Sequence, residues 1–292
     1  MTRIALAQYP VEFLAEWSSF ERKIEGLVAE AADAGARLLV FPEYGAMELA
    51  SLLPAEWRKD VRRQLVELQP FLDGFLALHA RLARRHQVSI VASSFPVRIG
   101  ERFRNRAYVA TPDERLRFQE KLMMTRFETE AWGVSAGDAV RVFNTPVGRI
   151  GISLCYDIEF PLIARRQAEA GARLILAPSC TDTLAGHHRV HVGARARALE
   201  SQVYVGVAPT VGAAAWSPAI DVNVGRAALY CPPDRGLPDD GTLALGALDV
   251  PGWVMAEIDL EAVAAVRNDG QVLNDRDWPR HFAIAAPPAE IL

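Results

Sequence analysis

Short apolar runs alternate with longer amphipathic stretches along this chain of 292 residues, and the alternation limits the folds that it can adopt. Apolar runs at residues 3–8, 38–41, 89–92, 107–110, 116–120 and 174–177 have the length of strands. Stretches at residues 15–34, 161–170 and 185–201 have the spacing of helices, as does most of 56–86, with a break near 70–74. The pattern predicts a layered α/β protein rather than an all-α or all-β one.

The C-terminal part of the chain continues the same pattern. Strands are expected at residues 204–208, 227–230, 243–248 and 254–258, and a short helix at 260–266. Residues 231–241 are rich in proline, glycine and aspartate and predict a loop. No repeat or linker divides the chain, and half of its residues are hydrophobic, enough for one large core. We therefore expect a single domain over residues 1–280, followed by a C-terminal tail at 281–292.

Charge and cysteine content limit the partners and the compartment. The net charge of -4 and a pI of about 5.9 give no basic field for nucleic acid or an anionic membrane. The first residues, MTRIALAQYPVEF, predict neither a signal peptide nor a membrane span. Cys155, Cys180 and Cys231 are odd in number and widely spaced, which favours a reducing compartment, so a cytoplasmic location is expected. The sequence contains no glycine-rich phosphate loop before a helix, so it does not imply a nucleotide cofactor.

Cys155 lies at the end of an apolar run in GISLCYDIEFP, where a strand is expected to turn into a helix. A thiol at such a turn projects from a rigid edge, and the next backbone N–H, that of Tyr156, can point at a developing oxyanion. This geometry suits a nucleophile that transfers acyl groups. The alternative is a buried, inert thiol, because free cysteine often packs as a small hydrophobic residue.

Two other apolar runs end in charged residues. Residues 38–41 stop at Pro42 and are followed by Glu43, and residues 116–120 are followed by Lys121. Side chains just past the carboxyl ends of strands line the ligand crevice of α/β sheets, so these groups can meet Cys155 there. A lysine favours the thiolate and then the oxyanion, and a carboxylate can move the thiol proton. The alternative for each residue is an ordinary solvated charge.

These segments resemble the carbon–nitrogen hydrolase, or nitrilase, superfamily. The similar stretches are LVFPEYGAMEL, QEKLMMTRFETE, GDAVRVFNTPVGRIGISLCYDIEFP and ARARALESQVYV, and the resemblance runs from Arg3 to about Trp278. It implies that Glu43 is the general base, that Lys121 stabilises the tetrahedral intermediate and that Cys155 forms a thioester. It also implies an α-β-β-α sandwich, and a homodimer or higher homo-oligomer formed through helices near the nucleophile. The helix at 185–201 and the tail after Asp269 are the segments expected at that contact.

Many members of this superfamily have a second glutamate that holds the lysine. Glu128 and Glu130 are both candidates, and we favour Glu130 because of its spacing to the Gly-Asp pair in EAWGVSAGD. Glu128 remains the alternative, with a role at the substrate. The histidine that usually follows the lysine is absent, and Leu122-Met123-Met124 stands in its place, which suggests an apolar wall.

Further side chains are candidates for contact with substrate. Trp132 could form an aromatic wall, and Cys180, after Ala-Pro-Ser, occupies a place that often lines the pocket; core packing is the alternative for both. In HHRVH, His187 and His191 would share one helix face, as metal ligands can. No glutamate follows His187, as a zinc protease motif requires, so we expect no metal site.

The expected activity is cofactor-independent hydrolysis of a non-peptide carbon–nitrogen bond in a small amide or N-carbamoyl compound. Nitrile hydrolysis and acyl transfer to an amine would use the same three residues. A catalytically idle member that serves as a binding protein is the alternative from another class, although Glu43, Lys121 and Cys155 are all present. The identity of the small-molecule substrate stays open.

Overall fold

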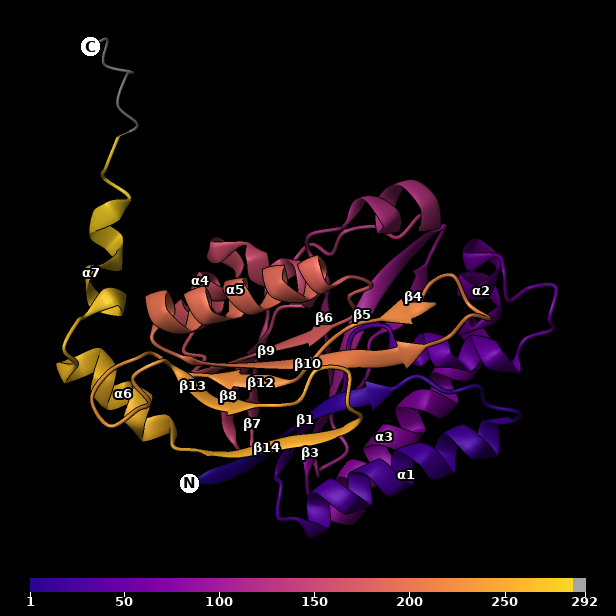
Figure 1. The fold of residues 1–292 in the computed structure, drawn as a ribbon, viewed down its shortest axis with the longest axis horizontal. Coiled ribbons are helices and arrows are strands. Elements are labelled where there is room, and N and C mark those ends of the chain that lie inside the picture. The colour runs from indigo at the N-terminus through magenta and orange to yellow at the C-terminus, as the bar shows by residue number, and fades with distance from the viewer. Residues whose placement is uncertain (286–292) are drawn as a thin grey trace.

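The structure is a computed structural model that describes residues 1–285. Its strands form one curled sheet with two halves, which are joined where Tyr9 pairs with Thr210 and Pro10 pairs with Val211. Each half has three parallel strands at its centre and antiparallel strands at its sides (Figure 1). The two halves pack face to face, with helices outside them.

The first half contains β1 (Thr2–Pro10), β2 (Leu38–Val40), β3 (Ser89–Val91), β4 (Phe95–Ile99), β5 (Arg102–Ala110), β6 (Leu116–Glu120) and β14 (Gly252–Ile258). The second contains β7 (Val142–Thr145), β8 (Gly148–Ile152), β9 (Leu174–Ser179), β10 (Tyr204–Ala213), β12 (Ala228–Tyr230) and β13 (Thr242–Leu245), and β11 (Val222–Asn223) pairs with the end of β10.

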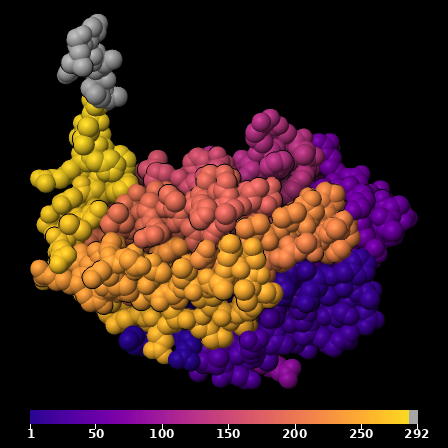
Figure 2. Space-filling model, viewed as in Figure 1, coloured from indigo at the N-terminus to yellow at the C-terminus, as the bar shows by residue number. Residues whose placement is uncertain are grey.

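Helices cover the outer faces. The helices α1 (Trp17–Asp33), α2 (Val61–Glu67) and α3 (Leu72–His86) belong to the first half, and α4 (Pro161–Glu169) and α5 (Leu184–Ser201) belong to the second. The C-terminal helices are α6 (Leu260–Asp269) and α7 (Asn274–His281), and α7 lies at one end of the molecule, where Asp275 pairs with Arg165 of α4 at 2.8 Å (Figures 1 and 2). Short helical turns occur at Gly45–Leu52, Gln69–Phe71, Phe127–Trp132 and Cys155–Glu159.

Alternation of side chains along the strands builds three apolar layers. On β1, Ile4 and Leu6 point between the two halves of the sheet, while Ala5 points toward α1 and α3. On β9, Leu176 points inward and Ile175 points toward α4 and α5. Successive side chains of a strand face opposite sides, so each half is apolar on both faces. The expected α-β-β-α sandwich is confirmed.

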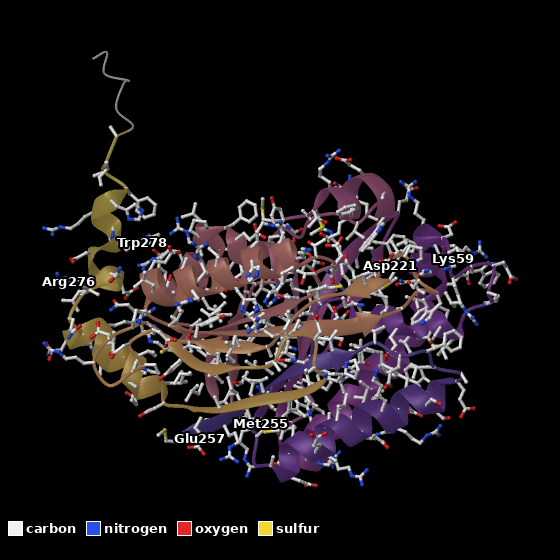
Figure 3. The ribbon with its side chains drawn as sticks, in the orientation of Figure 1. Lys59, Asp221, Met255, Glu257, Arg276 and Trp278 are labelled. Carbon is white, nitrogen blue, oxygen red and sulfur yellow. The ribbon has the colours of Figure 1, made fainter. Side chains whose placement is uncertain are left out.

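Side chains on the edge strand β14 follow the same rule. Met255 and Glu257 share the outer face in Figure 3, where Met255 packs on the helical layer and Glu257 forms an ion pair with Arg3 at 2.9 Å. The figure also labels Arg276 and Trp278 on α7, at the opposite end of the molecule from Lys59 and Asp221.

Most expected elements are confirmed, with shifted ends. The stretch at 56–86 is divided into α2 and α3, and its break falls at residues 68–71. The strands β4 and β7 and the helix α7 were not expected. The expected tail at 281–292 begins on the last residue of α7, and residues 286–292 of it lie outside the described part. Within residues 1–285, no helix combines the length and the apolar character needed to cross a membrane.

Candidate active site

Lys121 is the centre of a buried ionic network. It follows β6, and its Nζ lies 2.8 Å from Oε1 of Glu43 and 2.7 Å from Oε2 of Glu128. The lysine side chain is only 2% exposed, and both carboxylates are equally buried. Burial alone would lower the pKa of Lys121, but the two carboxylates outweigh it and hold the pKa well above its usual value. The ammonium is therefore charged throughout the neutral range.

Glu43 is placed by the end of β2 and held by a neighbouring strand. Its Oε1 also accepts a hydrogen bond of 3.0 Å from Nδ2 of Asn105, a fully buried residue on β5. Burial raises the pKa of Glu43 to about 7, although the charge of Lys121 and contact with the thiol of Cys155 both act to lower it. A carboxylate with such a pKa can accept and return a proton at neutral pH. Glu43 has the position and the acidity of a general base.

Of the two candidate glutamates, Glu128 contacts Lys121, and Glu130, which we preferred from the sequence, does not. Besides Lys121, Glu128 accepts hydrogen bonds from Tyr44 Oη at 2.8 Å and from the backbone N–H of Thr125 at 2.9 Å. Burial would raise the pKa of Glu128, but the charge of Lys121 lowers it below its usual value.

Glu130 lies two residues further along and is exposed. It forms an i,i+4 ion pair with Arg126 at 2.9 Å, on the outer side of the helical turn 127–132. Surface pairs with this spacing are common on helices, so the Arg126–Glu130 spacing is a local signal that sequence reasoning missed.

Cys155 opens the helical turn that follows β8. Its φ of 46° is left-handed, a conformation that costs energy for any residue with a side chain and that is frequent at functional sites. The residue is 6% exposed, and its Sγ lies 3.7 Å from the carbonyl oxygen of Cys180. Burial first, and then the negative charge of Glu43, raise the pKa of the Cys155 thiol well above its usual value. The side chain of Cys155 is therefore a neutral thiol at neutral pH.

Asp157 connects the cysteine turn to the segment of the lysine. Its carboxylate accepts backbone hydrogen bonds from Met123 at 2.7 Å, from Leu122 at 3.1 Å and from Leu154 at 3.2 Å. Burial raises the pKa of Asp157 to about 7 despite these donors. One side chain thus joins the residues after Lys121 to the residue before Cys155.

The other predicted contact residues surround this network. Trp132 packs edge to face on Tyr44, with ring centroids 5.3 Å apart, and both belong to one apolar cluster. Cys180 follows β9, and its sulfur lies 3.6 Å from Oδ1 of Asn223. The ring of Tyr156 packs on Phe160, and its backbone N–H directly follows the nucleophile in the chain.

The contacts that Asn105 and Tyr44 make with the two glutamates were not predicted. Asn105 reaches Glu43 from 62 residues away, and Tyr44 reaches Glu128 from 84 residues away, so no local pattern signals either contact.

The histidines of HHRVH are used elsewhere. His191 contacts the hydroxyl of Tyr230 at 2.7 Å through Nδ1 and the carbonyl oxygen of Arg226 at 3.2 Å through Nε2, so both ring nitrogens have protein partners. The ring of His187 lies 4.1 Å from that of His191. Across residues 1–285, no three His, Cys, Asp or Glu side chains are grouped so that they could hold a metal ion.

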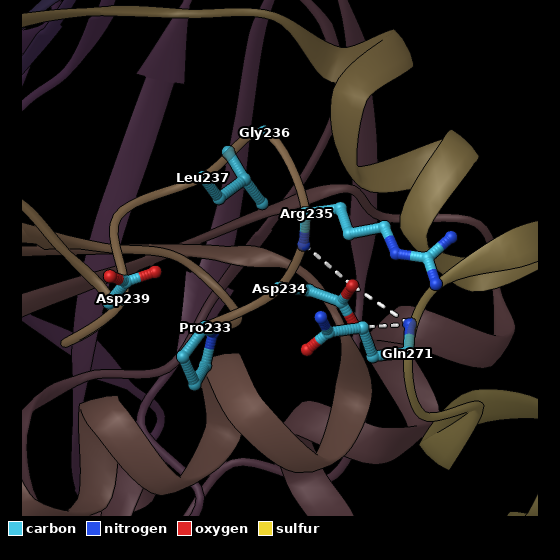
Figure 4. A pocket seen from close by; sticks show the side chains of 7 residues that line it. All are labelled: Pro233, Asp234, Arg235, Gly236, Leu237, Asp239 and Gln271. Carbon is cyan, nitrogen blue, oxygen red and sulfur yellow. Dashed lines mark hydrogen bonds between the residues drawn. The ribbon is translucent and has the colours of Figure 1, made fainter.

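A separate hollow of about 190 Å³ lies between the loop after β12 and the loop between α6 and α7 (Figure 4). The carboxylate of Asp234 accepts the backbone N–H groups of Arg235 at 2.7 Å and Gln271 at 2.9 Å, so it fastens these two loops together. None of the residues that line the hollow belongs to the network around Lys121. The hollow is a structural junction rather than part of the candidate active site.

Comparisons with known proteins report which family and which fold this chain resembles. The sequence model of the carbon-nitrogen hydrolase family matches residues 3–268. Probable hydrolase YhcX of Bacillus subtilis strain 168 is 32% identical over 278 residues, which cover 95% of this chain and 54% of that protein. The chloroplastic omega-amidase of Arabidopsis thaliana is 28% identical over 214 residues, which cover 69% of this chain and 53% of that protein. The chain thus spans about half the length of these two relatives.

A solved structure has the same fold. The carbon-nitrogen hydrolase of Helicobacter pylori G27 superposes with a TM-score of 0.74 over 97% of this chain and 94% of that one, at 19% sequence identity. At this level of identity the likeness supports the layered architecture alone.

Proposed function

The chain belongs to the carbon-nitrogen hydrolase family, and we propose that it hydrolyses a carbon–nitrogen bond other than a peptide bond in a small amide or N-carbamoyl compound. The observation that carries the proposal is the buried Glu43–Lys121–Glu128 network beside the thiol of Cys155. A base, a fixed cation and a nucleophile in one water-poor site are the groups that acyl transfer requires. The omega-amidase name of the Arabidopsis relative favours amides over nitriles as substrates.

In the first half of the proposed reaction, Glu43 accepts the proton of Cys155 while the sulfur attacks the carbonyl carbon. Proton transfer and attack are coupled, because the pKa of the thiol is raised well above that of Glu43, which is about 7. A C–S bond forms, and the carbonyl electron pair moves onto oxygen. The Lys121 ammonium and the backbone N–H of Tyr156 stabilise that oxyanion.

In the second half, the oxyanion collapses and the C–N bond breaks. Glu43 gives its proton to the leaving nitrogen, so that ammonia or an amine departs and a thioester remains on Cys155. Glu43 then takes a proton from water, whose oxygen attacks the thioester. The C–S bond breaks, the thiol regains the proton, and the carboxylic acid product leaves. No cofactor takes part in the proposed cycle.

Glu128 is a positioning residue in this proposal. It holds Lys121 at 2.7 Å and is itself held by Tyr44 and Thr125, so the ammonium keeps one place while Glu43 changes its protonation state. Fixed charges stabilise a transition state without reorganising, which is the main advantage of such a network.

The test uses purified protein, Cys155→Ala and the control Cys231→Ala, whose thiol lies in the core between the two halves of the sheet. Each is incubated with small amides, N-carbamoyl amino acids and nitriles, while ammonia release and intact mass are measured. We expect ammonia and an acyl adduct with wild type and Cys231→Ala, and neither with Cys155→Ala. Activity that persists in Cys155→Ala would overturn the proposal. An added amine acceptor separates hydrolysis from acyl transfer.

We also propose a homodimer, with α5 and the segment after Asp269 at its contact. On α5, Val192 is 69% exposed, and Leu184 and Leu199 are also exposed. Beyond α7, Phe282 is exposed as well. Apolar side chains grouped on one surface favour association, and light scattering of wild type and Val192→Glu tests it.

The three cysteines are free, which supports our proposal of a cytoplasmic location.

A further inference from the structure

We infer that the acyl group accepted at Cys155 carries no carboxylate, so that the substrates are small uncharged amides. This inference rests on the proposed function and narrows it. It also separates this chain from enzymes that act on the monoamides of dicarboxylic acids, whose acyl group is an anion. Four features of the site carry it: a saturated lysine, paired arginines, nearby acidic residues and an apolar wall.

The cation at the site is already fully engaged. Lys121 contacts Glu43 at 2.8 Å and Glu128 at 2.7 Å, and in the active form of the enzyme both carboxylates are ionised. Two negative charges then surround one positive charge. A carboxylate on the substrate would enter a site with a net negative charge, and like charges at short range in a poorly hydrated site repel strongly.

Three arginines beside the catalytic segments have carboxylate partners of their own, whereas Arg62 contacts the backbone carbonyl oxygen of Ala131. The pairs are Arg106 with Glu120 at 2.9 Å, Arg126 with Glu130 at 2.9 Å and Arg189 with Glu159 at 3.5 Å. Arg226 lies near His187 and His191. A substrate carboxylate would have to compete with an existing partner for each paired arginine.

Acidic residues add to the negative charge near the nucleophile. Asp157 lies two residues after Cys155 and is buried, and because its pKa is about 7 it carries a partial negative charge at neutral pH. Asp182 is exposed on the loop after Cys180, and its charge acts on the thiol of Cys180. The carbonyl oxygen of Cys180 is in turn 3.7 Å from the sulfur of Cys155. A carboxylate approaching along this loop would meet a like charge.

The remaining neighbours offer apolar surface. Trp132, Met124 and Cys180 are partly buried and pack on the same apolar cluster as Tyr44. The phenol oxygen of Tyr44 is engaged by Glu128 at 2.8 Å. Such a wall binds an uncharged acyl group by apolar contact and provides no partner for an anion, whose desolvation would then go uncompensated.

Succinamide and succinamate form a matched pair that tests the inference, because they differ only in an amide group against a carboxylate. Succinamide that loses one amide group becomes succinamate. We expect wild-type enzyme to release one equivalent of ammonia from succinamide and then stop, with kcat/KM for succinamide at least about tenfold above that for succinamate. Release of two equivalents, or equal turnover of both compounds, would overturn the inference while the proposed function stands.

Butyramide and other neutral amides in the same assay distinguish a failure of the inference from a failure of the proposed function. If no amide is hydrolysed, the proposed function fails and the inference fails with it. The variant Asp182→Asn removes one exposed charge close to Cys180. We expect it to raise kcat/KM for succinamate by about two- to threefold and to leave that for succinamide unchanged. An equal change for both compounds would contradict the electrostatic explanation.

Discussion

The Oδ1 atom of Asp157 accepts the backbone N–H of Met123 at 2.7 Å, and this bond joins the turn that begins at Cys155 to the strand end that carries Lys121. Cys155 and Lys121 come from different halves of the sheet, so their separation depends on such a link. The backbone N–H groups of Leu122 and Leu154 also donate to Asp157. Asp157 therefore helps to hold the turn of Cys155 in place relative to Lys121.

Replacing Asp157 with Asn should lower kcat about 10- to 100-fold with little change in KM, since misplaced catalytic groups affect the transition state more than binding. An amide offers one acceptor oxygen in place of two, so buried N–H groups lose partners. The free energy of unfolding should fall by about 1–3 kcal/mol. Steady-state kinetics and urea unfolding measure the two effects. Unchanged kcat alongside a loss of stability would leave Asp157 with a purely structural role.

The glutamates Glu128 and Glu130 give a matched pair of variants. Glu128→Gln should lower kcat about 100-fold or more, because Lys121 loses a buried ionic partner and its position. Glu130→Gln should change kcat less than about twofold, since its ion pair with Arg126 is exposed and such pairs contribute little. The kcat of each variant is measured on one amide. An equal loss of kcat in both variants would refute the assignment of Glu128 as the residue that positions Lys121.

The layers and the strand ends could be predicted from sequence because each depends on a local run of apolar residues. Glu43, Lys121 and Cys155 follow such runs directly, and their proximity follows from the layered fold. The choice between Glu128 and Glu130 was harder, because residues 127–132 form a π-helical turn, and the i,i+4 spacing of Arg126 and Glu130 was a local signal that Glu130 faces outward. Asn105 lies in the middle of β5, and only the tertiary fold brings it to Glu43.

The pH dependence of kcat/KM should report the ionisation of Glu43. The pKa of this carboxyl is raised to about 7 and its ionised form is the base, so activity should rise with pH through about 7 and then level off. At pH 6 the rate should be about tenfold below the plateau. Lys121 should cause no decline on the alkaline side below about pH 9, because its pKa is raised.

Asp157 also has a pKa of about 7, so it needs a control in that experiment. If Glu43 is the base, Asp157→Asn keeps the inflection near pH 7 at a lower rate, and loss of the inflection would assign it to Asp157. The thermal stability of the protein should fall as the pH rises, whereas the activity should increase. Carboxyls with a raised pKa bind more protons in the folded protein than in the unfolded one, so Tm should fall as pH rises from about 5 to 7.

The close approach of α5 to the turn of the nucleophile gives a last prediction. A Cβ atom added at Gly193 would lie 2.9 Å from the carbonyl oxygen of Ile158, within the turn that Cys155 opens. Backbone atoms cannot rotate away, so Gly193→Ala should displace the turn, lower the free energy of unfolding by about 1–3 kcal/mol and reduce kcat. Gly26→Ala is the control, because a Cβ at Gly26 in α1 meets nothing within 4 Å. There the higher helix propensity of alanine should add about 0.5–1 kcal/mol with kcat unchanged. Urea unfolding and amide kinetics on both variants measure this, and a Gly193→Ala protein with the stability and kcat of wild type would show that the approach of α5 does not position Cys155.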